Sequence, residues 1–105
     1  MLMSLCHVFA DNTGQCKYEG IPGAYVYVTV DRTNNTGRVV NVRSYGVSEG
    51  TVTVVVTYHH NLKDFTKTYS VDIRNGVGQL YDGAINVYDE IKKVEVYNAV
   101  CTSIK

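Results

Sequence analysis

Hydrophobic and polar residues alternate with a period of two along most of this chain. Between residues 24 and 31, Val26, Val28 and Val30 share one face of an extended backbone, while the residues between them face the other way. Successive side chains of a β-strand point to opposite faces, so the pattern predicts a strand with one buried face.

The same period recurs in further short segments rich in Val, Thr, Tyr and Ile. β-Branched and aromatic residues favour strands over helices. The predicted strands cover residues 24–31, 38–45, 51–58, 65–74, 77–81, 84–88 and 92–101.

Turn residues separate these segments at a regular spacing. Asn75-Gly76 is the strongest hairpin signal, because a two-residue type I′ turn needs positive φ at both positions. Residues 60–64 are predicted to close a hairpin onto the 65–74 strand. The predicted inward set of that strand is Phe65, Tyr69, Val71 and Ile73.

Seven to eight short strands at this spacing, with no segment of helical period, indicate an all-β fold. The 105 residues suffice for one hydrophobic core. We therefore predict a single-domain antiparallel β-sandwich. Residues 1–19 are expected to form an N-terminal strand or arm and its connection, and residues 20–105 the sandwich core.

The stretch TVTVVVTYHHN, residues 51–61, begins with eight β-forming residues that carry no charge. Such a segment promotes aggregation at an open sheet edge, so we expect it in a central position. Its flanking strands are expected to be 38–45 and 65–74 or their neighbours. His59 and His60 then lie at the end of the strand and point to opposite faces, so they do not share a metal ion.

In strand rhythm, residues 20–101 resemble the immunoglobulin-like and fibronectin-III-like β-sandwiches. The chain departs from antibody domains because it contains no Trp, and so lacks the core Trp that they place between two Cys. Sandwiches of this kind occur as decoration, fibre and adhesive modules on bacteriophage particles. The resemblance implies an immunoglobulin-like layout and a role of that type.

The charge balance excludes two classes of partner. Ten Lys and Arg offset ten Asp and Glu, giving a formal net charge of +0. Neither nucleic acid nor an anionic membrane is therefore expected as a partner, whereas low net charge favours association with other proteins. Residues 1–12 lack the basic start of a secretion signal, so we expect synthesis in a host cytoplasm.

Three cysteines, Cys6, Cys16 and Cys101, show no C-x-x-C and no zinc or redox spacing. An odd number in an expected cytoplasm favours reduced, structural thiols. One disulfide and one free thiol is the alternative.

Candidate chemistry is sparse elsewhere. Asp82 and Asp89 are the best calcium candidates, but a turn explains Asp82 before Gly83 equally well, and the alternating oxygen ligands of a calcium loop are missing. The sequence shows no Ser-His-Asp order, phosphate-binding glycine loop or basic aromatic patch. We expect no catalytic activity, no cofactor and no metal.

The tyrosines predict the binding surface. They are out of phase with the neighbouring valines, and outward aromatic rings give large contact area at low entropy cost. The alternative is that they pair across strands and stabilise the sheet. Together with the apolar N-terminal segment, the candidate interface residues are Met3, Leu5, Phe9, Tyr25, Tyr27, Tyr45 and Tyr97.

These features predict a non-enzymatic structural protein that works by assembly. The leading hypothesis is a bacteriophage virion component, such as an auxiliary capsid (decoration) or head-fibre protein. Its partners are protein subunits, either its own copies or a capsid lattice, in a homo- or hetero-oligomer.

The alternative hypothesis is a secreted or surface adhesion or carbohydrate-binding module. In that case, exposed tyrosines stack on sugar rings, and Asp82, Asn86 and Asp89 bond to the hydroxyls. A disulfide between Cys101 and an N-terminal cysteine favours this alternative, whereas three free thiols favour the virion hypothesis.

Overall fold

The computed structural model describes the backbone of residues 6–10, 12–33 and 37–104, and the side chains of residues 12–33 and 37–104. The described residues form eight β-strands and no helix. The strands are β1 (Cys6–Ala10), β2 (Thr13–Lys17), β3 (Tyr25–Arg32), β4 (Arg38–Tyr45), β5 (Val47–His60), β6 (Lys63–Ile73), β7 (Val77–Asp82) and β8 (Glu90–Ile104).

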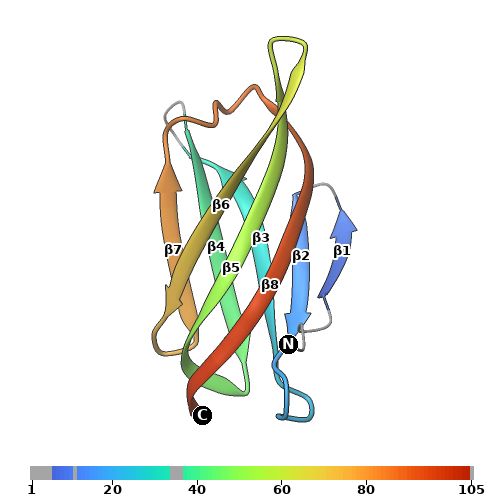
Figure 1. Cartoon of the computed structure of the whole chain (residues 1–105). Coiled ribbons are helices and arrows are strands. Elements are labelled where there is room, and N and C mark those ends of the chain that lie inside the picture. The colour runs from blue at the N-terminus through green and yellow to red at the C-terminus, as the bar shows by residue number, and fades with distance from the viewer. Residues whose placement is uncertain (1–5, 11, 34–36, 105) are drawn as a thin grey trace.

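Two antiparallel sheets pack face to face (Figure 1). One has the strand order β1-β2-β3-β4-β7, and the other has the order β6-β5-β8. The predicted antiparallel β-sandwich is confirmed. The strand order differs from that of immunoglobulin constant domains, which use the orders ABED and CFG, because β1 to β4 pair consecutively here.

The alternating valines build the core between the sheets. Val26, Val28 and Val30 of β3 are fully buried, as is Val54 in the middle of β5. Burying one such side chain contributes about 1.5–3 kcal/mol. Ile85, in the connection between β7 and β8, is also fully buried and closes one end of the core.

The charge-free 51–58 run is central, as predicted, because β5 lies between β6 and β8. Its second neighbour is β8 rather than the 38–45 strand. The expectation of short strands is wrong here, since β5 has 14 residues and β8 has 15. Both extend along the 41 Å long axis of the domain.

The β5–β6 hairpin rises above the rest of the sandwich (Figure 1). Its two-residue turn has positive φ at Asn61 (50°) and Leu62 (67°), as a type I′ turn requires. Phe65 has the predicted inward phase, since it pairs with the buried Tyr58, but near this tip no second sheet lies opposite and Phe65 is 41% exposed. Tyr69 further along β6 is buried, as predicted.

Three local predictions need correction. Asn75-Gly76 does form a tight turn, but only Arg74 and Val77 pair across it, and the chain then passes from one sheet to the other. Residues 84–88 form a loop instead of a strand. Within residues 1–19, the stretch 11–15 was expected to be irregular, but β2 begins at Thr13 and pairs with β3.

Candidate functional site

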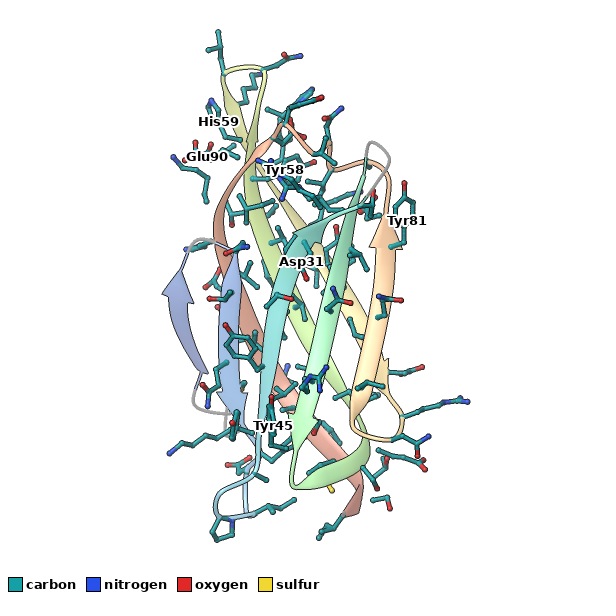
Figure 2. The ribbon with its side chains drawn as sticks, turned by 180° about the vertical axis from the view of Figure 1, so that it is seen from behind. Asp31, Tyr45, Tyr58, His59, Tyr81 and Glu90 are labelled. Carbon is teal, nitrogen blue, oxygen red and sulfur yellow. The ribbon has the colours of Figure 1, made fainter. Side chains whose placement is uncertain are left out.

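The outer face of β3, β4 and β7 carries aligned rows of aromatic and polar side chains, which we call the tyrosine face. The antiparallel register sets these rows, because directly opposed residues point to the same side of a sheet. One row consists of Tyr27, Arg43 and Val77, and the next of Thr29, Asn41 and Gln79. Figure 2 shows Asp31, Tyr45 and Tyr81 over these three strands.

A shallow groove of about 810 Å³ crosses this face. Its walls combine aromatic rings, amides, a carboxylate, two guanidinium groups and one exposed valine. The side chains that line it include Tyr27, Thr29, Asp31, Asn41, Arg43, Tyr45, Arg74, Val77 and Gln79.

A hydrogen-bond network fixes the polar part of the groove. The Asp31 carboxylate accepts bonds from the Thr29 hydroxyl and the Asn41 amide, each at 2.7 Å. The Gln79 amide donates to the Asn41 side-chain oxygen at 2.8 Å. These side chains are therefore held in one orientation across three strands, while donors and acceptors remain for a ligand.

Positive charge predominates in the groove. Arg43 and Arg74 line it, and neither has a carboxylate partner among residues 12–33 and 37–104. Its one acidic side chain, Asp31, is already engaged by two neutral donors. The region beside the arginines is thus positive on a chain of zero net charge.

Three of the four predicted tyrosines belong to this face. Tyr25 and Tyr45 stack with ring centroids 4.6 Å apart, and Tyr27 lies in the adjacent row. The three rings face outward as predicted, and Tyr25 and Tyr45 also pair across strands; binding of a partner by these rings stays a prediction.

Tyr97 lies instead on β8, on the opposite side of the sandwich. Its hydroxyl donates to the Glu95 carboxylate. This bond, together with slight burial, raises the pKa of Tyr97. Tyr97 is therefore not part of the surface that unites the other three tyrosines.

The N-terminal candidates cannot be added to the site. Met3 and Leu5 lie outside the described residues, and Phe9 belongs to β1, whose side chains are likewise outside them. Their role in an interface stays a prediction.

The histidines are in separate environments. His59 Nδ1 lies 2.7 Å from the Asp64 carboxylate across the β5–β6 hairpin, and His60 Nδ1 lies 2.6 Å from Asp89. No group of three or more metal-ligating side chains occurs within the side chains that the structure describes. His59 therefore links the two strands of the hairpin, and His60 links the hairpin to the loop that precedes β8.

The proposed sugar ligands serve the structure of the 83–89 loop. Asp82 bonds to Lys67, Tyr69 and the Ala84 amide. Asn86 and Asp89 bond to backbone amides of the loop itself, those of Tyr88 and Asn86. The side-chain oxygens of all three residues are therefore engaged in bonds within the protein.

Arg38 holds the same loop from inside the sandwich. Its guanidinium donates to the carbonyls of Asn86, Val87 and Asp89, the last at 2.6 Å. Burial and the nearby charge of Arg32 lower the pKa of Arg38. These bonds fix the conformation of the loop.

The sequence predicted the tyrosines of the groove but neither of its two arginines. Arg43 shares the outward phase of Val39 and Tyr45, so the alternation of β4 could have identified it. Arg74 carries no such signal, because it follows a strand of the other sheet and reaches the groove only through the crossing turn.

The cysteines differ from the expectation of three reduced thiols. Cys16 is disulfide-bonded, whereas Cys101 is free. The backbone register places Cys6 opposite Cys16. The free state of Cys101 excludes the bridge that would have favoured a secreted module, and the bonded state of Cys16 excludes three free thiols.

Comparison with known proteins identifies no relative. No family model matches the chain, and no curated protein or solved structure matches it. Within the described residues, no helix is long and apolar enough to cross a bilayer.

Proposed function

We propose that this chain is a non-enzymatic structural protein of a virus particle, such as a bacteriophage decoration or head-fibre protein. It binds protein subunits through the tyrosine face. The supporting observation is that Tyr25, Tyr27 and Tyr45 share one face with exposed Val77 and Tyr81. Rigid strands present these side chains, so little conformational entropy is lost on docking.

The two exposed residues extend the apolar part of this surface. Val77 is 50% exposed and Tyr81 is 55% exposed, both on β7. A partner that covers them removes apolar area from water, and many copies on a lattice multiply a modest single affinity. The disulfide at Cys16 is compatible with this location, because disulfides persist on virion and cell surfaces.

Fractionation of virus particles tests the proposal. Particles from a lysate of the source culture are purified on a density gradient and probed with an antibody to this chain. We expect the chain to co-sediment with the particles at a fixed copy number. A chain that stays with the soluble or cell-surface fraction contradicts the virion assignment.

Light scattering over a concentration series tests whether the tyrosine face binds further copies. Tyr45→Ser removes an exposed ring from the face, and Tyr97→Ser is the matched control on the opposite sheet. If copies associate through this face, Tyr45→Ser raises the dissociation constant about tenfold and Tyr97→Ser leaves it unchanged. Equal effects of the two variants contradict this use of the face.

A carbohydrate-binding surface module is the second candidate. The observation in its favour is the groove itself, where Tyr27 and Tyr45 lie beside the oriented amides of Asn41 and Gln79. Aromatic rings stack on sugars, and fixed amides bond to hydroxyls. Selective binding of the chain to immobilised glycans, lost in Tyr27→Ala, would favour this function.

A further inference from the structure

We infer that the groove and the adjacent edge of β7 accept an extended, acidic segment of a partner protein, which adds to the sheet as a further strand. This inference rests on the proposed function and names the chemistry of the partner. Strand addition at an open edge takes affinity from main-chain hydrogen bonds and specificity from alternate side chains.

The edge of β7 is open. β7 is the last strand of its sheet and pairs only with β4. Among the described residues, no backbone hydrogen bond outside that pairing involves residues 78–82. Their outward amide and carbonyl groups are therefore available to another strand.

This edge also lacks the charges found on the two edge strands of the other sheet. β6 carries Lys63, Asp64, Lys67 and Asp72, and β8 carries four charged residues and several register shifts. Charges and bulges are how proteins prevent strand addition at an edge. The residues of β7 that face outward are Val77, Gln79 and Tyr81, all uncharged.

The arginines define which segment fits. A strand added beside β7 runs about 10 Å from β4, which is two strand spacings. Arg74 pairs with Val77 across the turn and occupies the place beside it, so the added strand starts opposite Gln79. A Glu at that position can extend over β7 toward Arg43 in the neighbouring row, and toward Arg74. Neither guanidinium has a carboxylate partner within the described residues, so a carboxylate supplied by a partner would be the first to pair with them.

A peptide fits this surface better than a saccharide. The groove ends at an unpaired main-chain edge, and only a polypeptide can continue the ladder of hydrogen bonds. The half-exposed Val77 between the arginines favours a ligand that combines carboxylates with apolar groups.

NMR titration of the ¹⁵N-labelled full chain tests the inference. The probes are an alternating Glu-Thr peptide, the matched Gln-Thr peptide and tri-galacturonate as an acidic saccharide. We expect the acidic peptide to bind about tenfold more tightly than its neutral match. The largest chemical-shift changes should occur at the backbone amides of β7, and these amides should also gain protection from hydrogen exchange.

Variants identify the charges involved. Arg43→Gln and Arg74→Gln should each weaken the acidic peptide about threefold to tenfold, and Arg32→Gln, an exposed arginine outside the groove, should change it less than about twofold. The dispersion of each variant's spectrum shows whether it remains folded.

Two results overturn the inference. The first is that the two peptides bind equally or that neither binds. The second is that tri-galacturonate binds through Arg43 and Arg74 while the acidic peptide does not bind. The particle fractionation is independent of both. If the chain co-sediments with particles but does not bind the acidic peptide, only the inference is refuted. If the chain binds the peptide but is absent from particles, only the virion assignment is refuted.

Discussion

At the residue scale, Asp82 shows how neighbouring donors determine a charge state. Burial alone would raise its pKa, but hydrogen bonds from Tyr69, Lys67 and the Ala84 amide outweigh burial, so the pKa of Asp82 is lowered. Lys67 Nζ lies 2.9 Å and the Tyr69 hydroxyl 2.7 Å from the carboxylate. Burial and this carboxylate raise the pKa of Tyr69.

The lowered pKa predicts a loss of stability in acid. A carboxyl whose pKa is lower in the folded than in the unfolded state stabilises the fold above the unfolded value of about 3.9, and this contribution disappears as the pH falls through the folded value. Asp82→Asn should therefore lower the free energy of unfolding at pH 7 by about 1–3 kcal/mol and flatten its decline below about pH 4.

Urea denaturation at a series of pH values measures both effects. Asp72→Asn is the matched control, because Asp72 is exposed on β6 and has no ion-pair partner among the described residues. An identical pH profile for Asp82→Asn and the unsubstituted chain would contradict the assignment.

Leu62 is a strained and exposed residue at the hairpin tip. It has a φ of 67° and is 93% exposed, so neither its backbone nor its side chain gains from packing. Glycine is the preferred residue at this position of a type I′ turn. We predict that Leu62→Gly raises the free energy of unfolding by about 0.5–1 kcal/mol. Thermal unfolding followed by circular dichroism checks this, and a destabilised variant would disprove it.

At the element scale, the pairing of β5 with β8 depends on a close approach of their backbones. The register between them shifts near Glu49 and Gly50. A Cβ on Gly50 would lie 2.1 Å from the Val100 carbonyl oxygen, which is backbone and cannot rotate away. Only glycine therefore allows the two strands to meet at this irregularity.

We predict that Gly50→Ala destabilises the domain by about 3 kcal/mol, because the added methyl group separates two paired strands. Gly83→Ala is the control, since the nearest atom to its Cβ is the mobile Tyr81 hydroxyl at 3.2 Å. Chemical denaturation of both variants measures the difference. If the two variants have similar denaturation midpoints, β8 can shift without loss of stability and the prediction is wrong.

At the scale of the whole molecule, the pairings connect distant parts of the chain. β4 pairs with β7 and β5 with β8, each across two intervening strands. Closing such loops costs entropy before the contacts stabilise the fold. We predict that refolding takes about 1 ms to 1 s, as for other all-β sandwiches.

Stopped-flow refolding from urea, monitored by tyrosine fluorescence, measures this rate. The reductant-free and reduced chains are compared, because a disulfide at Cys16 restricts the unfolded state. A microsecond phase that accounts for the whole signal would contradict folding limited by the distant pairings.

The sequence by itself determined the class of fold and the orientation of most side chains. Alternation is a local property of extended backbone, so Val26, Val28 and Val30 could be assigned to the core and Tyr25 and Tyr27 to the outside before any partner strand was known. It missed β2, because Cys16 is the only apolar residue of that strand and leaves no alternation to detect.

Only the tertiary structure decided which strands share a sheet and where a sheet ends. Phe65 has the inward phase of Tyr69, but it lies beyond the opposing sheet and is exposed. Residues 84–88 alternate like a strand, yet Arg38 binds the carbonyls of this segment and holds it as a loop. In both cases the arrangement of distant parts of the chain, rather than the local pattern, decides the outcome.

The candidate site also combines features that the sequence predicts with features that only the tertiary structure decides. The outward phase of Tyr27 and Tyr45 follows from their own strands, but their grouping with Arg74, and the separation of Tyr97, follow from the order of strands in two sheets. Strand order depends on pairings between segments far apart in the chain, which a local period of two leaves undetermined.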